Sequence, residues 1–379
     1  MNILLLANYL PDEQQSMQRF AALLETGLTQ AGHRVKVIRP QARFGGLMPS
    51  PTGLGKWLGY IDKFFVFPVE LRRDRDRFDI VHICDHSNAF YTPYLSQFPH
   101  LVTCNDLLAV RSALGEIPEN RTSWTGKYLQ RLILNGLNRA HRIACISEKT
   151  REDVLRLTVL DRDRVTTVYM GQNYPYSPMS PEETQARLKN LGIAPGTPFL
   201  FHIGGNQWYK NKLGIVSIFN EVLKQDNGKD LYFVFAGQSF PEDVGDRIAE
   251  YGIGDRVREV GKVDNEDLRA LYSGAVALLF PSLQEGFGWP IAEAQACGCP
   301  VFTSNIAPMT EVGGEAAIYI DPKDCKEAAK TIVETRSHLS DYREAGLENA
   351  KRFAPETMIS DYAQLYDKII AEFRLRSDR

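Results

Sequence analysis

Short apolar runs alternate with longer helical patterns along the whole chain, and this alternation constrains the fold more than any other feature. In the first half, a helical pattern over residues 14–32 follows the first apolar run. The runs that read as strands cover residues 3–7, 35–38, 79–83, 101–104 and 142–146. Fully apolar strands spaced by helices are typical of a parallel, doubly wound sheet. The pattern therefore predicts an α/β fold.

The same alternation restarts after a loop at residues 174–181, which holds three prolines and two serines and suits a linker. The second set of strands is expected over residues 199–203, 231–236, 258–260, 277–280 and 300–303. The chain has 379 residues, which at roughly 150 residues per domain suggests two domains. We predict a first domain over residues 1–172, joined by a long amphipathic helix within about 357–379, and a second domain over residues 195–356.

The overall composition excludes several classes of protein. The net charge is −3 and 24% of the residues are charged, which is typical neither of a disordered chain nor of a nucleic-acid-binding protein. The first apolar run lacks a basic region and a cleavage site, so we expect a buried first strand rather than a signal peptide. We find no stretch of about 18 apolar residues that would predict a membrane span. These features predict a cytoplasmic protein.

The cysteines predict no metal site and no disulfide framework. None of the six forms a Cys-x-x-Cys pair, and several lie in apolar runs, where cysteine acts as a small hydrophobic residue. We therefore expect reduced thiols in the core. The six cysteines are Cys84, Cys104, Cys145, Cys297, Cys299 and Cys325.

The segment at residues 281–294 carries the most chemical information. It follows the strand expected at 277–280, and Gly286 and Gly288 permit a tight turn with close backbone approach to a ligand. A helix that begins here presents backbone N–H groups suited to phosphate. We expect Glu293 in its first turn, accepting hydrogen bonds from a ribose diol, and Glu285 on the loop, accepting from sugar hydroxyls. An ordinary turn with one helix-dipole glutamate is the alternative, but it does not explain the whole ordered string.

This string resembles the E-x7-E signature of glycosyltransferase family 4, which comprises retaining enzymes of the GT-B fold. The resemblance is strong over residues 199–325 and weaker over 1–195. It implies two Rossmann-like domains that face each other across a cleft, with a nucleotide-sugar donor held by the second domain and an acceptor by the first. The matching residues include Pro300–Ser304 and Glu311–Gly314 after the string, and the donor-binding residues implied within it are Glu285, Gly286, Phe287, Gly288 and Glu293.

A second segment, at residues 202–211, follows a strand and opens a helix. A glycine turn with a lysine at the helix start is a natural cradle for a diphosphate, and here it comprises Gly204, Gly205, Asn206 and Lys210. The resemblance implies that Lys210 neutralises the leaving diphosphate. The family usually has an arginine near position 205 or 206, so its absence gives Lys210 more importance. Lys212 either contributes to this cradle or is a surface lysine.

The first domain offers weaker signals. The resemblance implies a histidine that contacts the donor sugar near the reaction centre, and His86 is our candidate, whereas His82 reads as a core histidine. Asp106 fits either the acceptor region or a turn, and Ser147 reads as a helix cap. The loop after the first strand lacks the family's Gly-Gly pair, and we place Ser16 and Met17 at the helix start that replaces it.

The motifs predict catalysis without a metal ion or other cofactor. We find no Asp-x-Asp motif at a strand end, and Asp74-Arg75-Asp76 reads as a solvated face. Lys210 and the helix N-termini are expected to stabilise the leaving group instead. The resemblance implies retention of anomeric configuration, and the predicted catalytic residues are His86, Lys210 and Glu285.

The sequence specifies the donor and the acceptor less closely than it specifies the reaction. We favour UDP-glucose or a related UDP-hexose as donor and a polysaccharide or lipid-linked saccharide as acceptor. The alternatives are a GDP-mannose-dependent mannosyltransferase and a catalytically silent nucleotide-binding protein of polysaccharide assembly. Aromatic and basic residues interleave over 53–77, which fits peripheral contact with the inner membrane face or a packed helix with a solvated basic end.

Overall fold

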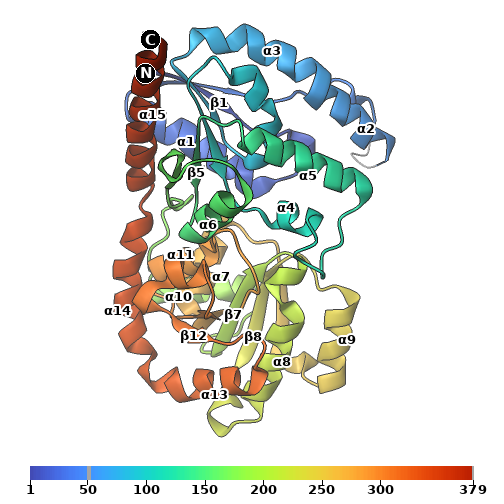
Figure 1. Cartoon of the computed structure of the whole chain (residues 1–379). Helices are drawn as coiled ribbons and strands as arrows, with labels where there is room; N and C mark the ends of the chain where they lie inside the picture. Colours follow the sequence, from blue (N-terminus) through green and yellow to red (C-terminus); the bar gives the residue numbers. More distant parts are fainter. Residues whose placement is uncertain (49–52, 378–379) are drawn as a thin grey trace. The chain divides into compact units, whose positions relative to one another are not determined.

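A computed structural model describes residues 1–48 and 53–377. The chain divides into two compact units, of which the first comprises Met1–Asn173 with Pro355–Arg379 and the second Tyr174–Ala354 (Figure 1). The last two residues of the segment that we joined to the first domain, 378 and 379, lie outside the described residues.

The first unit is built on a parallel sheet. Within the described residues this sheet has six strands in the order β2-β1-β3-β4-β5-β6. The strands are β1 (Asn2–Leu6), β2 (Arg34–Ile38), β3 (Ile80–Ile83), β4 (His100–Cys104), β5 (Arg142–Cys145) and β6 (Val165–Thr167). The central strands are buried on both faces, which explains why their sequences are apolar without alternation.

Helices cover both faces of the first sheet. Successive side chains of a strand point to opposite faces, and Leu4 and Leu6 of β1 pack in the cluster that contains Phe67 and Leu71 of α3. The helices and helical segments of this unit are α1 (Gln15–Gln30), α2 (Leu54–Ile61), a π-helical turn (Asp62–Val66), α3 (Phe67–Asp74), a 3₁₀ segment (His86–Leu95), α4 (Leu108–Ala113), α5 (Trp124–Leu137), α6 (Glu148–Leu157) and α15 (Pro355–Ser377).

The C-terminal helix α15 is fixed to the opposite face of this sheet by a buried polar chain. The imidazole of His82 in β3 contacts the Tyr366 hydroxyl through Nδ1 and the Thr103 hydroxyl through Nε2, both at 2.7 Å. Thr103 in turn lies 2.9 Å from the Tyr362 hydroxyl. The prediction that His82 is a core histidine is therefore confirmed. Figure 1 shows α15, in dark red, beside α1, where Phe20 packs against Tyr362.

The second unit repeats the architecture. Its parallel sheet has six strands among the described residues, in the order β12-β11-β10-β7-β8-β9. The strands are β7 (Phe199–Gly204), β8 (Tyr232–Gly237), β9 (Val257–Gly261), β10 (Ala277–Phe280), β11 (Val301–Ser304) and β12 (Ile318–Ile320). The helices are α7 (Pro181–Asn190), α8 (Lys212–Leu223), α9 (Glu242–Tyr251), α10 (Asn265–Gly274), α11 (Trp289–Ala296), α12 (Met309–Gly313), α13 (Cys325–Thr335) and α14 (Leu339–Ala350).

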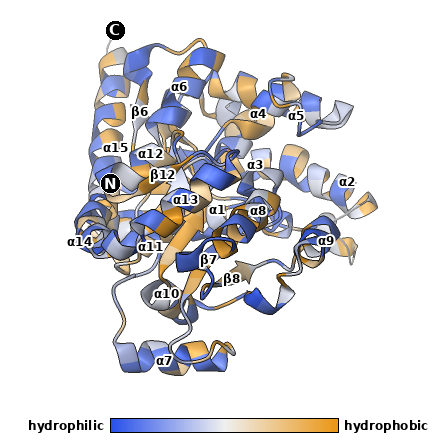
Figure 2. Cartoon of the chain, turned by 90° about the horizontal axis from the view of Figure 1, so that it is seen from below, coloured by the Kyte–Doolittle hydropathy of each residue, from blue (hydrophilic) through white to orange (hydrophobic). Residues whose placement is uncertain are grey.

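The helices of the second unit bury apolar faces against both sides of its sheet. On one side Phe219 of α8 packs against Phe233 of β8, and on the other Tyr272 of α10 packs against Phe201 of β7. The outer helices α7 and α9 mix hydrophilic and hydrophobic residues, as expected of helices with one buried face (Figure 2). The order of strands and helices confirms the predicted α/β class.

The described residues contain six free cysteines. Five cysteines are buried and Cys325 is half-buried, all six with free thiols, which agrees with the expected core thiols. Burial raises the pKa of Cys84 and Cys145 above the usual range of a thiol. No helix among the described residues combines the length and the apolarity that a bilayer crossing requires.

Candidate functional site

The loop between β10 and α11 is shaped by glycine at its end. Gly288 has a φ of +100° and precedes Trp289, the first residue of α11, so a side chain here would strain the backbone. Pro290 follows in the first turn, where its lost N–H would have no helical partner. The expectation that Glu293 lies in the first turn is wrong, because the helix begins at Trp289 and Glu293 is its fifth residue.

Lys210 and Glu285 form an ion pair at the carboxyl end of the second sheet. Lys210 ends the 3₁₀ turn Trp208–Lys210 after β7, and Glu285 lies on the loop after β10. The distance between Lys210 Nζ and Glu285 Oε1 is 2.7 Å, with the side chains 15% and 9% exposed. Lys210 Nζ also lies 5.0 Å from the centre of the Phe280 ring. A mostly buried ammonium at a strand end is suited to an anionic ligand.

Two further contacts fix the loops that carry this pair. The Leu283 N–H donates to the Tyr209 carbonyl at 2.8 Å, and the Asn211 side-chain amide donates to the Pro281 carbonyl at 3.0 Å. Asn211 itself has a φ of +57°, a conformation that asparagine tolerates better than most residues. The positions of Lys210 and Glu285 are therefore set by the backbone of both loops.

Glu293 is held from within the core. Its Oε2 accepts a hydrogen bond of 2.9 Å from the hydroxyl of Tyr272 in α10, and both side chains are buried. Burial, followed by the charge of Glu293, raises the pKa of Tyr272 well above its ordinary value, so the tyrosine stays a donor. This hydrogen bond orients the carboxylate that the sequence predicts to bind a ribose diol.

Gly204 is the last residue of β7, and Gly205 and Asn206 follow it. The Asn206 N–H donates to the side-chain carbonyl of Gln238 at 3.1 Å. The Lys212 ammonium donates to Asn206 Oδ1 at 2.8 Å and to the Gln238 carbonyl at 3.0 Å. Lys212 is 6% exposed, and burial lowers its pKa. The prediction of a surface lysine is wrong, because Lys212 ties the loop after β7 to the loop after β8.

Three buried polar atoms near these strand ends have no hydrogen-bond partner among the described residues. They are His202 Nε2, Ser282 Oγ and Gln284 Oε1. His202 Nδ1 lies 3.0 Å from the Leu279 carbonyl, which only accepts, so Nδ1 carries the proton. Burial lowers the pKa of His202 to about 3, which keeps the imidazole neutral. Buried groups of this kind are candidates for ligand contacts. The sequence analysis did not predict these residues, and the only signal for Ser282 and Gln284 is their position just after a strand.

In the first unit, His86 is paired with a buried carboxylate. His86 Nδ1 lies 3.1 Å from Asp85 Oδ1, although the N–H is not aligned for a straight hydrogen bond. Asp85 also accepts from the Asn8 amide at 2.6 Å, from the Asn105 amide at 3.0 Å and from the Ser87 hydroxyl. These donors come from the loops after β1, β3 and β4. The sequence predicted His86 but did not identify its partner Asp85.

Opposite effects act on the two members of this pair. Burial alone would raise the pKa of the Asp85 carboxyl, but the charge of His86 and the donated hydrogen bonds outweigh it and hold that pKa below its usual range. Burial would likewise lower the pKa of His86, but the charge and hydrogen bond of Asp85, together with the charge of Asp106, outweigh it and raise that pKa. Each residue therefore favours the charged form of the other.

The remaining predicted residues of the first unit have local roles. Ser16 and Met17 lie in the first turn of α1, Ser16 exposed and Met17 half-buried. The Ser147 hydroxyl accepts from the Thr150 N–H at 3.0 Å, which confirms the predicted cap. Asp106 accepts from the Leu108 N–H at 2.9 Å, which is a turn contact at the start of α4.

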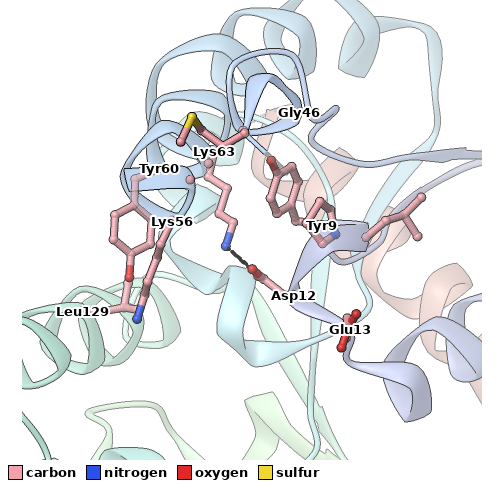
Figure 3. A pocket seen from close by; sticks show the side chains of 14 residues that line it. Tyr9, Asp12, Glu13, Gly46, Lys56, Tyr60, Lys63 and Leu129 are labelled. Carbon is pink, nitrogen blue, oxygen red and sulfur yellow. Dashed lines mark hydrogen bonds and ion pairs between the residues drawn. The ribbon is translucent and has the colours of Figure 1, made fainter. Parts of the chain in front are cut away.

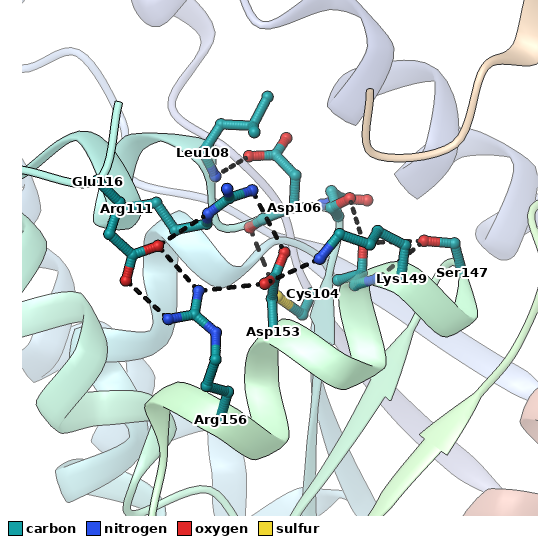
Figure 4. A network of polar contacts seen from close by, with 11 residues as sticks. Cys104, Asp106, Leu108, Arg111, Glu116, Ser147, Lys149, Asp153 and Arg156 are labelled. Atoms are coloured by element: carbon teal, nitrogen blue, oxygen red, sulfur yellow. Dashed lines mark hydrogen bonds and ion pairs between the residues drawn. The ribbon is translucent and has the colours of Figure 1, made fainter. Parts of the chain in front are cut away.

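A charged network adjoins these caps (Figure 4). Arg111 lies 3.1 Å from Glu116 and 3.5 Å from Asp153, and Arg156 bonds both carboxylates. Hydrogen bonds from Arg156 are the main cause that lowers the pKa of Glu116 to about 2. The network links α4 to α6, and the sequence analysis predicted no role for it.

The solvated face predicted at Asp74-Arg75-Asp76 is only partly observed. Asp74 is 9% exposed and pairs with Lys36 of β2 at 2.7 Å, and Arg75 donates to the Tyr94 carbonyl. The prediction for these two residues is wrong because both face partners distant in the sequence.

Two doubly wound parallel sheets with polar loops at their carboxyl ends define the GT-B class of glycosyltransferase. Solved structures share this fold over nearly the whole chain. Sucrose-phosphate synthase from Thermosynechococcus elongatus matches with a TM-score of 0.75 and 19% identity over 98% of this chain and 100% of that one. HepE from Anabaena, in complex with UDP and glucose, matches with a TM-score of 0.75 and 16% identity over 97% and 100%.

Sequence comparison identifies the family. The family model described as "Glycosyltransferase Family 4" matches residues 17–173, and that of "Glycosyl transferases group 1" matches residues 183–352. The chain therefore belongs to glycosyltransferase family 4. An O-antigen chain mannosyltransferase B of Escherichia coli is 28% identical over 77% of this chain and 75% of that protein. A D-inositol 3-phosphate glycosyltransferase of Corynebacterium glutamicum is 23% identical over 85% and 78%.

Proposed function

We propose that this glycosyltransferase moves a mannosyl group from a nucleotide-activated mannose to a saccharide acceptor of polysaccharide synthesis, with retention and without a metal ion. The Lys210–Glu285 pair is the observation that carries the reaction. The mannosyl group is supported by the 28% identity to a mannosyltransferase and by the 26% identity to the serotype-specific mannosyltransferase WbdA of Escherichia coli. A UDP-hexose, favoured in the sequence analysis, is the competing donor.

Each residue of the second unit has a defined task in this proposal. Lys210 neutralises the diphosphate as the bond between the anomeric carbon and the phosphate oxygen breaks. Glu285, the ion-pair partner of Lys210, accepts a hydrogen bond from a sugar hydroxyl. Glu293, oriented by Tyr272, accepts from the ribose hydroxyls. The glycine turn at Gly204 and Gly205 lets the phosphates approach the backbone.

The chemical step is a same-face substitution. The acceptor hydroxyl oxygen bonds to the anomeric carbon on the side that the diphosphate leaves, and the hydroxyl proton passes to an oxygen of the leaving diphosphate. His86, whose charged form Asp85 favours, contacts the donor sugar. Isolation of a covalent glycosyl-enzyme would contradict this step and indicate a double displacement.

A thermal shift series tests the donor and the metal independence together. The protein is heated with GDP, UDP or ADP, with and without EDTA, since a ligand of the native state raises the melting temperature. We expect GDP to stabilise the protein and EDTA to leave the shift unchanged. Stabilisation by UDP alone would favour the UDP-hexose reaction, and a shift abolished by EDTA would contradict the metal-free proposal.

A turnover assay then tests catalysis itself. GDP release from GDP-mannose without acceptor is measured, because an active transferase hydrolyses its donor slowly. Nucleotide binding without any release, from GDP-mannose or UDP-glucose, would favour a silent binding protein instead.

A further inference from the structure

A polar cavity of about 490 Å³ lies in the first unit, beside the loop after β1. Its charged lining residues are Asp12, Glu13, Lys56 and Lys63 (Figure 3). The Lys63 ammonium contacts Asp12 at 2.5 Å and lies 4.9 Å from the centre of the Tyr9 ring. Tyrosine faces, carboxylates and ammonium groups around one hollow are suited to a ligand rich in hydroxyl groups.

The wall of this cavity is held by one buried carboxylate. Asp62, which is 1% exposed, accepts from the Tyr9 hydroxyl at 3.1 Å and from the N–H groups of Phe44 and Gly45 at 3.0 and 2.9 Å. Burial, followed by this hydrogen bond, raises the pKa of Tyr9 to about 12. At Gly45 a Cβ would lie only 2.2 Å from the Tyr9 hydroxyl oxygen. The loop after β1 and the segment containing α2 therefore form one fixed surface.

A second hollow, the aromatic groove, adjoins the polar cavity and has about 550 Å³ of space. It runs between the α2–Val66 segment and α5, and its aromatic lining residues are Trp57, Tyr60, Phe64, Phe65, Trp124 and Tyr128. Phe65 is 73% exposed and Trp124 is 80% exposed. Trp57, Ile61, Phe65 and Val69, which are spaced four positions apart, are all exposed. Apolar clusters of this size on a protein surface mark interaction sites.

The two hollows are joined through shared walls. Tyr60 and Leu129 line both of them. The Tyr60 ring lies 5.6 Å from the Trp57 ring and 5.8 Å from the Phe64 ring, while Lys63 Nζ lies 5.6 Å from the centre of the same Tyr60 ring. Tyr60 thus marks the border between the charged groups of the polar cavity and the mainly aromatic lining of the groove. A ligand that occupies both hollows is polar at one end and apolar at the other.

We propose that the polar cavity and the aromatic groove together bind an amphipathic acceptor, with its saccharide in the polar cavity and its hydrocarbon chain in the aromatic groove. This inference rests on the proposed function and names the chemical class of the acceptor. A peptide partner fits less well, since its backbone needs many hydrogen-bond partners, whereas among the described lining residues only Thr125 is neither aromatic nor aliphatic. Tryptophan and tyrosine, each apolar with a polar tip, suit the boundary between chain and head group.

Binding of two synthetic glycosides to the full-length protein tests this assignment. Methyl and dodecyl α-D-mannopyranoside are titrated calorimetrically, the latter below its critical micelle concentration. Because each buried methylene adds affinity, we expect the dodecyl compound to bind at least about tenfold tighter. We also expect tryptophan emission to shift to the blue, since Trp57 and Trp124 lie in the groove. Both results use the wild-type protein and depend on no variant. Equal affinities for the two glycosides would overturn the proposal.

Three substitutions distinguish the contributions of the two hollows to glycoside binding. Trp124→Ser is expected to abolish the higher affinity for the dodecyl glycoside and to leave the affinity for the methyl glycoside unchanged. Asp12→Asn is expected to lower the affinity for both glycosides by a similar factor. Val159→Ser, at a valine of the same unit that is 82% exposed and does not line the groove, serves as the matched control and should change neither affinity. Loss of methyl glycoside binding in Trp124→Ser, with Asp12→Asn unaffected, would contradict the assignment of the saccharide end.

Two other occupants of the groove have distinct signatures. Vesicles of phosphatidylcholine and phosphatidylglycerol that bind through Trp124, with no preference for the dodecyl glycoside, would show that the groove docks on a bilayer. A dimer seen by light scattering and dissolved by Trp124→Ser would show that a second copy fills it. Either result overturns the proposal. The shift with GDP or UDP is recorded on the same samples, because its absence contradicts the proposed function and not the groove.

Discussion

The Lys210 ammonium lies 2.7 Å from the Glu285 carboxylate, although the two residues are 75 positions apart in the sequence. Both side chains are mostly buried, and a buried charge without a partner is costly. The pair therefore fixes an ammonium at the strand ends. We expect a bound diphosphate to take over part of the contact that Glu285 supplies.

Lys210→Ala is predicted to lower kcat sharply, because the nearby Lys212 ammonium is engaged by Asn206 and the Gln238 carbonyl and does not replace the lost charge at the diphosphate. Removal of one preorganised stabilising group costs about 3 kcal/mol, or roughly a hundredfold in kcat. Lys229→Ala, at an exposed lysine paired with Asp226, is the control and should retain full activity. Donor turnover measures both, and a kcat within threefold of wild type for Lys210→Ala would remove this lysine from the mechanism.

Asp85→Asn is predicted to lower kcat and to move the pH–rate profile to lower pH. The charge of Asp85 raises the pKa of His86, so its removal lowers that pKa and the charged imidazole is lost earlier as pH rises. The exposed Asp161→Asn is the matched control. A uniform loss of activity at every pH would mean that Asp85 only supports the structure.

Tyr272→Phe is predicted to raise the KM for the donor. The variant loses the 2.9 Å hydrogen bond to Glu293, and a hydrogen bond to a charged group contributes about 1.5 kcal/mol or more, which corresponds to roughly a tenfold change in binding. We expect kcat to change little. Tyr366→Phe, which loses a hydrogen bond to His82, is the control and should reduce stability with no effect on KM. A normal donor KM in Tyr272→Phe would contradict the role of Glu293.

Local patterns predicted ten of the strands among the described residues, most of them as apolar runs. The exceptions are β6 (Val165–Thr167) and β12 (Ile318–Ile320), edge strands of three residues each. Three residues give no periodic signal, and both strands exist only because a neighbouring strand pairs with them.

The site was predicted in part, and the remainder depends on contacts between distant segments. The motif string identified Lys210 and Glu285 but not that they pair. The burial of Lys212 requires Gln238 from the loop after β8, which no local pattern places nearby. Similarly, residues 53–77 showed one wall of the aromatic groove, whereas Trp124 and Tyr128 supply the other from α5.

The two fully buried histidines predict how stability changes with pH. Burial lowers the pKa of both His82 and His202 to about 3, while an unfolded chain titrates its histidines near about 6.5. Between these values the unfolded state binds more protons than the folded state, so each histidine makes the free energy of unfolding rise with pH. The maximum contribution is about 1.4 kcal/mol per pH unit for each histidine.

His202→Gln is therefore predicted to reduce this slope between about pH 3 and 6.5, whatever its effect on stability at neutral pH. His82→Gln should do the same for the first unit. Urea unfolding at several pH values in this window measures the slope, and His338→Gln, at an exposed histidine, is the matched control. An unchanged slope in both buried variants would mean that these histidines take up protons in the folded state, which their burial opposes.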